Sequence, residues 1–149
     1  LTREEMEEIC TLGLEVCVLN DTRFCAIGNN IACNDFGAVV NPDIPEEIAA
    51  EIGKTLKVPV FSHEIAGYKT AGMMVVATNR GWIAHNRISE EEAQTLEKIF
   101  AVKGRNTTVN SGTAMVGLGV IANSKAAVCG ESTTGFESGR VEEGLDIVG

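Results

Sequence analysis

Apolar residues recur with helical spacing in four stretches of the chain, and each stretch opens on a signal for a helix start. Thr2, Ser89 and Thr134 are each followed three residues later by Glu. In such a capping box the hydroxyl and the carboxylate satisfy free backbone amides of the first turn. Pro45 opens the remaining stretch, at a first-turn position where no amide donor is needed. These starts lie 43, 44 and 45 residues apart, which predicts four one-sided helices at a nearly fixed interval.

Short apolar runs flank a polar turn between the helices, again in register. The predicted hairpins cover residues 31–40, 75–84 and 120–128, headed by Gly28, Gly72 and Gly117. We expect the Asn and Gly residues of their turns to supply positive φ angles. A further short strand is expected after each of the first three helices, at residues 15–18, at 58–61 and around Val102.

A unit of hairpin, helix and strand therefore repeats about every 44 residues. One unit of this size cannot bury its own apolar face, so such units form an open array or a closed ring. The short apolar strands lack the polar caps of an open array, which favours a ring. No linker divides the chain, so residues 1–149 are predicted to form a single α+β domain.

Composition and charge narrow the classes of function. The 149 residues are 44% apolar, enough for a core, and carry a net charge of −9. That charge argues against DNA, against an extended nucleic-acid groove and against anionic membrane surfaces. The longest nearly apolar run, residues 114–122, is too short to span a bilayer. Five scattered cysteines without C-x-x-C pairs indicate reduced thiols in a cytoplasmic protein, and we expect neither a metal nor a cofactor.

Five blocks of sequence resemble the translation initiation factor 6 family, in the family's order and register. They are AIGNNIACND (26–35), LKVPVF (56–61), VATNRG (76–81), VIANSK (120–125) and GESTTG (130–135). The acidic character and short ending look archaeal. The resemblance implies a pentein fold, in which five pseudo-repeats surround a five-fold axis with small strands inside and helices outside. About three and a half repeats are present, namely the end of repeat 2 and repeats 3, 4 and 5, so the chain looks N-terminally incomplete.

The same resemblance implies a function without chemistry. Members of the family bind the large ribosomal subunit, sterically block its premature association with the small subunit, and act in large-subunit maturation. The implied partners are ribosomal proteins beside the sarcin–ricin loop, with some rRNA contact. The turns that head each repeat contribute to the ribosome-facing surface in the family. Carried over by position, this nominates Asn29, Asn30, Met73, Met74, Asn110, Ser111, Gly112 and Thr113.

Simpler roles compete with this assignment. The Asn and Gly residues can serve turn geometry alone, and Met73 and Met74 can fill the core, although strand alternation would turn one of them away from it. The last helix also departs from the family pattern. It has Phe136 where the family usually has Pro, and Gly139 and Gly144 each weaken a helix by about 1 kcal/mol relative to Ala.

Charge is unevenly distributed along the chain. The four helical windows (2–10, 45–56, 89–100 and 134–147) hold 15 of the 21 acidic residues and 4 of the 12 basic ones, a net charge of −11. The remaining turns and strands carry +2, including Arg80, Arg87, Lys103 and Arg105. In a ring with its helices outside, the acidic residues would therefore lie on the rim. The remaining face would be nearly neutral and could contact ribosomal protein and nearby rRNA.

An enzymatic alternative also exists, because pentein folds host amidino-group hydrolases and transferases with a late Cys nucleophile. Cys129, His85 and Asp35 would be its catalytic set. Such a cysteine needs thiolate character and a nearby base, whereas Cys129 ends an apolar run in which a structural thiol is expected. Acidic runs such as 90–92 suit helix first turns better than a metal site, and Gly117 and Gly119 lack the rest of a nucleotide fingerprint. We therefore predict no enzyme.

Overall fold

Three similar units make up most of the computed structural model, which describes residues 2–19 and 21–147. The first unit consists of α2 (Ile27–Asn30), β1 (Ile31–Cys33), β2 (Ala38–Val40), α3 (Glu46–Leu56) and β3 (Val60–Ser62). The second consists of α4 (Ala71–Met74), β4 (Val75–Ala77), β5 (Trp82–His85), α5 (Glu90–Phe100) and β6 (Gly104–Thr107). The third consists of η2 (Val116–Leu118), β7 (Val120–Ala122), β8 (Ala127–Cys129) and α6 (Gly135–Leu145). Before them lie α1 (Arg3–Thr11) and η1 (Thr22–Phe24). The predicted α+β class is confirmed.

The three predicted hairpins are present, and their registers correspond. β1 pairs antiparallel with β2, β4 with β5 and β7 with β8. After the helix, β3 adds parallel to β2 and β6 adds parallel to β5. Among the described residues, the third sheet contains only β7 and β8.

The helices begin close to where the sequence predicts. Thr2, Ser89 and Thr134 each form a complete capping box at the start of α1, α5 and α6. Pro45 lies just before α3 rather than in its first turn, because its ψ of 146° is extended. Glu residues occupy the first turns of these helices as expected, where they complement the helix dipole.

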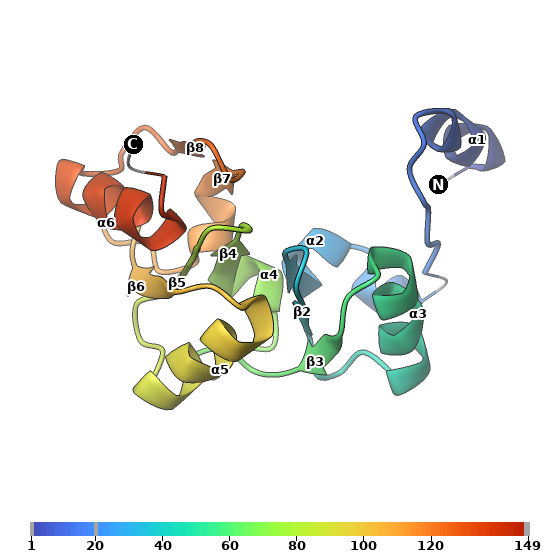
Figure 1. The fold of residues 1–149 in the computed structure, drawn as a ribbon, viewed down its shortest axis with the longest axis horizontal. Helices are drawn as coiled ribbons and strands as arrows, with labels where there is room; N and C mark the ends of the chain where they lie inside the picture. The colour runs from blue at the N-terminus through green and yellow to red at the C-terminus, as the bar shows by residue number, and fades with distance from the viewer. Residues whose placement is uncertain (1, 20, 148–149) are drawn as a thin grey trace.

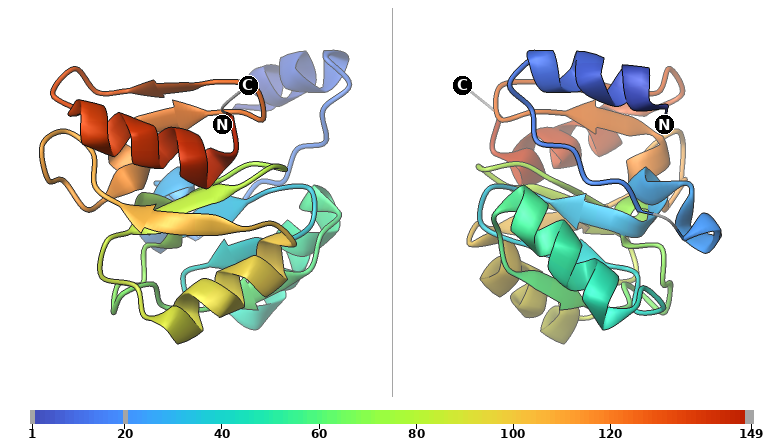
Figure 2. Two further views of the ribbon diagram at one scale, coloured as in Figure 1. Left: turned by 60° about the vertical axis from the view of Figure 1, so that its left-hand side comes forward. Right: turned by 90° about the vertical axis from the view of Figure 1, so that its right-hand side faces the viewer.

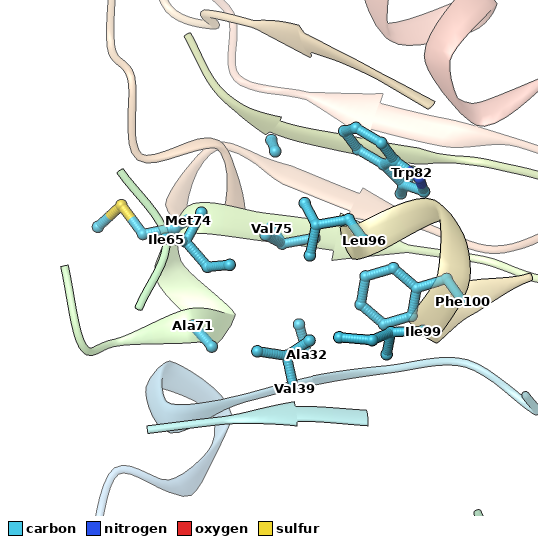
Figure 3. Close-up of a cluster of buried hydrophobic side chains, with 11 residues drawn as sticks. Ala32, Val39, Ile65, Ala71, Met74, Val75, Trp82, Leu96, Ile99 and Phe100 are labelled. Carbon is cyan, nitrogen blue, oxygen red and sulfur yellow. The ribbon is translucent and has the colours of Figure 1, made fainter. Parts of the chain in front are cut away.

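The first two hairpins are each covered by the helix of the following unit. Ala32 and Val39 of the first hairpin are buried in one cluster with Leu96 and Phe100 of α5 (Figure 3). Ile83 of the second hairpin is buried with residues of α6 such as Val141. A third cluster contains Phe24, Val40, Ile44 and Ile52. Two of the three clusters therefore lie at the junctions between units, and the third lies between α3 and β2 of the first unit.

The hairpin turns differ from the prediction, because none of their described Asn or Gly residues has a positive φ. Instead the Asn34 side chain accepts hydrogen bonds from the amides of Phe36 and Gly37 at 3.0 and 3.1 Å. A Cβ on Gly37 would clash with the carbonyl oxygen of Ile99 in α5. Glycine is thus needed here for the close approach of the next helix. Left-handed residues instead end the three long helices, at Lys57, Ala101 and Asp146.

The predicted strand at residues 15–18 is wrong, since this segment forms no strand. β3 and β6 each pair with the second strand of their own unit's hairpin. Among the described residues, only α1 precedes residues 15–18, so no hairpin strand lies beside this segment as β2 and β5 lie beside β3 and β6. It lies between the main body and α1, which stands apart from the three units (Figure 1).

The units follow one another in chain order from α3 and β3, through α4 and α5, to α6 and β8 (Figure 1). Two further views show the same succession of small sheets and helices (Figure 2). The described residues form an open series of units, so the closed ring remains a prediction.

No helix within residues 2–19 and 21–147 is long and apolar enough to cross a membrane. All five cysteines are free thiols in this structure.

A candidate binding face of stacked helical turns

The segments that head the three hairpins are single helical turns rather than strand extensions. α2, α4 and η2 contact one another in that order along the molecule. A Cβ on Gly72 would clash with the carbonyl oxygen of Gly28, and a Cβ on Gly117 would clash with that of Gly72. Glycine therefore permits backbone-to-backbone contact between consecutive turns. Consequently Asn29, Met73 and Leu118, which follow these glycines, occupy equivalent places on neighbouring turns.

The structure separates the predicted residues of the first two turns. Asn29 and Met73 are half-buried, with Met73 against the main hydrophobic cluster. Asn30 is buried; its amide donates to the Ala26 carbonyl at 3.0 Å, and its oxygen accepts from the Asn41 amide at 2.7 Å. Met74 is fully buried. In this structure the side chains of Asn30 and Met74 therefore support the turns from inside. Strand alternation does not apply to Met73 and Met74, because both lie in the helical turn α4.

Leu118 joins this face, although it was not among the predicted site residues. Its side chain is 58% exposed at the end of η2. The repeat spacing of the sequence could have indicated this residue, because Asn29, Met73 and Leu118 lie at intervals of 44 and 45 residues. An exposed leucine beside a half-buried methionine gives the face an apolar contact point.

The predicted residues 110–113 form a closed loop that leads into η2. Val109 and Thr113 pair as an isolated antiparallel bridge. Between them Asn110, Ser111 and Gly112 have φ angles of 49°, 58° and 109°. Left-handed backbone is unfavourable for non-glycine residues and persists only where surrounding contacts enforce it. Ser111, Gly112 and Thr113 are exposed.

The carboxylate of Glu137 supplies these contacts. It accepts hydrogen bonds from the Ser111 and Gly112 amides at 3.1 and 2.8 Å and from the Thr108 hydroxyl at 2.7 Å. It also closes the capping box with the Thr134 amide at 2.8 Å. The Thr134 amide, followed by the Thr108 hydroxyl and the Gly112 amide, lowers the pKa of Glu137 from 4.5 to about 2. The capping box was predicted, but its contact with a loop 25 residues away left no sequence signal.

Neighbouring residues brace the same loop. The Asn110 amide donates to the Thr133 hydroxyl at 3.1 Å, and the Ser111 hydroxyl donates to the Ser132 carbonyl at 2.7 Å. The loop is therefore attached both to the start of α6 and to the segment that precedes it. It offers a fixed polar surface next to the stacked turns.

The alternative catalytic residues serve structural roles in this fold. The Cys129 thiol is half-buried, and burial together with Glu142 and Glu137 raises its pKa, which opposes thiolate formation. His85 is buried against Tyr68, with a ring distance of 5.3 Å, and its Nδ1 accepts from the Arg87 amide. Burial and Arg87 lower the pKa of His85.

Asp35 is exposed and accepts from the Asn79 side chain at 2.6 Å. No group of three or more His, Cys, Asp or Glu side chains within the described ranges could hold a metal ion. The geometry therefore defines a repeat protein whose distinctive surface is the row of stacked turns and the loop beside it.

Comparison with known proteins identifies the family. The model of the eIF-6 family matches residues 1–144. Translation initiation factor 6 of Methanosarcina acetivorans is 43% identical over 146 residues, which cover 98% of this chain and 66% of that protein. The Methanosarcina mazei protein of the same name is 42% identical over 145 residues, 97% of this chain and 65% of that protein. The Methanoculleus marisnigri protein is 45% identical over 118 residues, 79% of this chain and 54% of that protein.

The chain belongs to the eIF-6 family, and the predicted resemblance is confirmed. The family is one of translation factors and not of enzymes. The chain spans less than two thirds of the length of these relatives.

Proposed function

We propose that this protein binds the large ribosomal subunit and sterically prevents its premature association with the small subunit, with a role in large-subunit maturation in the cytoplasm. The observation that carries the proposal is the family match over residues 1–144, together with relatives named translation initiation factor 6. Occupation of a surface requires no reaction. This agrees with a structure in which His85 and Asp35 have other partners and the pKa of the Cys129 thiol is raised.

The stacked turns and the 110–113 loop are the surface that supports this role best. Asn29, Met73 and Leu118 present one polar and two apolar side chains along neighbouring turns. Asn110, Ser111, Gly112 and Thr113 add a rigid polar rim, while Asn30 and Met74 hold the turns from beneath. An apolar centre with a polar rim is typical of a protein–protein contact.

Charge supports ribosomal proteins beside the sarcin–ricin loop as the main partners, with limited rRNA contact. Two of the basic residues outside the helices are already paired with α6. Arg80 lies 3.2 Å from Asp146, and Arg105 pairs with Glu143. Their positive charge is therefore partly neutralised, which weakens attraction to phosphate. Binding to an extended nucleic acid or to a membrane surface finds no support in this distribution.

A pentein ring is the architecture that these junctions favour. Each unit contacts the next through the same elements, turn on turn and helix on hairpin. The Methanosarcina acetivorans relative has about 220 residues, since 146 aligned residues make up 66% of it. That length corresponds to five units at the spacing of about 44 residues seen here.

Co-sedimentation of the chain with purified archaeal large subunits tests the function. We expect the chain to travel with large subunits and to reduce their joining to small subunits. A Met73→Glu/Leu118→Glu double variant should bind about 10-fold more weakly, because charge would replace the apolar contact point.

Leu12→Glu is the matched control, since Leu12 is exposed at the end of α1, which stands apart from the three units (Figure 1). This variant should bind like the wild type. Absence of co-sedimentation, or unchanged subunit joining, would overturn the function. Equal binding by the double variant would overturn the assigned face.

A further inference from the structure

Two glutamates at equivalent positions in consecutive units hold a loop through its backbone. Glu92 in α5 accepts from the Ala66 amide at 2.6 Å and from the Ser89 amide at 2.7 Å. Glu137 in α6 accepts from the Ser111 and Gly112 amides as well as from the Thr134 amide. The two glutamates lie 45 residues apart. In both units, the carboxylate that closes the capping box also binds the loop at the head of the same unit.

Both loops contain left-handed backbone that needs such support. Ala66 and Gly67 have φ angles of 53° and 79° between the bridged residues Ile65 and Tyr68. Loop 109–113 is longer and has three successive residues of positive φ. Amides of such a segment can point toward one site and bind an anion. Here a carboxylate of the protein itself is that anion.

Helix capping alone does not account for the arrangement. α3 forms a helix of 11 residues with Ile48 at the position of these glutamates and with no side-chain cap. Moreover, Glu137 is only 5% exposed, whereas Glu5 at the equivalent position of α1 is exposed. It also bonds Thr108, which lies outside both the helix and its cap. The loop contact is therefore additional to helix formation.

Each held loop leads directly into a turn of the candidate face. Loop 65–68 precedes α4, which carries Met73, and loop 109–113 precedes η2, which carries Leu118. Fixing the loop fixes the entry of the chain into the turn. A partner then binds a surface that is already ordered, which avoids the entropy cost of ordering it on binding.

We propose that Glu137, and Glu92 in the preceding unit, are positioning residues that hold these loops in the conformation that the ribosomal partner recognises. This inference rests on the proposed function for the identity of the partner. The holding of the loop itself is independent of that function. The two parts can therefore be tested separately.

Glu137→Gln is the decisive variant, compared with the wild type by amide hydrogen exchange and by co-sedimentation with large subunits. The amide group places an N–H where one of the two accepting oxygens was, so the Ser111 or Gly112 amide loses its acceptor. Exchange at Ser111 and Gly112 should accelerate about 10-fold or more through local opening. Binding to large subunits should weaken by a similar factor.

Two controls separate positioning from general instability. Thr134→Ala removes the cap hydroxyl and its 3.0 Å hydrogen bond to the Glu137 carboxylate, which costs a helix a comparable part of its stability. It keeps the bonds of this carboxylate to the Thr108 hydroxyl and to the Ser111 and Gly112 amides. It should retain slow exchange at Ser111 and Gly112 and should bind normally. Glu92→Gln should accelerate exchange at Ala66 and leave loop 109–113 unchanged.

Each outcome has a separate meaning. Unchanged exchange at Ser111 and Gly112 in Glu137→Gln would overturn the holding of the loop. Faster exchange with wild-type affinity would overturn the positioning role. Failure of the wild type to bind would overturn the proposed function, and with it the identity of the partner, while the exchange result would still decide whether the loop is held.

Discussion

At the scale of single residues, Gly139 and Gly144 of α6 have opposite surroundings. Gly139 is half-buried, with no atom within 4 Å of the position where a Cβ would lie. A Cβ on Gly144 would lie 2.6 Å from Ile83 Cγ2 and 2.9 Å from Arg105 Cγ. The last helix is therefore weakened locally at Gly139, whereas Gly144 allows it to pack closely on β5 and β6.

Alanine at the two positions should consequently change stability in opposite directions. Gly139→Ala should stabilise the protein by about 1 kcal/mol, the usual gain in helix propensity. Gly144→Ala should destabilise it by about 2 kcal/mol through overpacking. Urea unfolding followed by the fluorescence of Trp82, which is buried and the only tryptophan, measures both changes. Stabilisation by Gly144→Ala would contradict the packing account.

Glu137 makes stability depend on pH in the acid range. Its hydrogen bonds hold its pKa at about 2 in the folded protein, below the usual 4.5. A lowered folded-state pKa favours folding above the unfolded value, and this contribution is lost as pH falls from about 4.5 toward 2. The difference in Tm between wild type and Glu137→Gln should be largest near neutral pH and should shrink through this window. A difference independent of pH would show that the carboxylate charge does not matter.

At the scale of elements, the three stacked turns offer an internal comparison at one structural position. Gly72 and Gly117 each face a carbonyl oxygen of the preceding turn, whereas nothing lies within 4 Å of a Cβ on Gly28. Gly72→Ala should therefore separate α2 from α4 and cost about 3 kcal/mol. Gly28→Ala should be neutral, or stabilising by up to about 1 kcal/mol. Equal effects in urea unfolding would refute the backbone contact between turns.

Local signals in the sequence account for the elements that were predicted correctly. Three helices are located by capping boxes, at Thr2, Ser89 and Thr134. Three hairpins are located by the alternation of apolar runs with polar turns. The single turns were not predicted, because a helix of four residues is too short to show periodicity. The strand wrongly predicted at residues 15–18 shows a second limit of sequence patterns, because a strand needs a partner strand as well as an apolar sequence.

The candidate site was predictable only in outline. The repeat register placed Asn29, Met73 and the 110–113 loop at the heads of units. It could not distinguish Asn29 from Asn30 or Met73 from Met74, because which neighbour is buried depends on the helical turn. The second role of Glu137 depends on tertiary packing and on left-handed backbone at Asn110 and Ser111. Neither feature follows from local residue preferences.

At the scale of the whole molecule, one cross-strand pair lacks the cover that its counterparts have. Ala32 and Val39 are buried beneath α5, and Ile83 is buried beneath α6. The equivalent pair in the third hairpin, Ile121 and Val128, is 81% and 70% exposed. Among the described residues β8 also has no parallel strand beside it. An apolar pair beside an open sheet edge favours association with another chain.

The chain studied alone should therefore self-associate at micromolar concentration through this hairpin. Replacement of both Ile121 and Val128 by Lys should shift the chain toward monomer in analytical ultracentrifugation, because charge opposes burial of the face and pairing at its edge. Phe136→Lys is the control, since its exposed apolar side chain lies on a helix without an open strand edge. A wild-type chain that remains monomeric and melts in one sharp two-state transition would show that the uncovered hairpin is stable without a partner. Association that persists unchanged in the double Lys variant would place the contact elsewhere on the molecule.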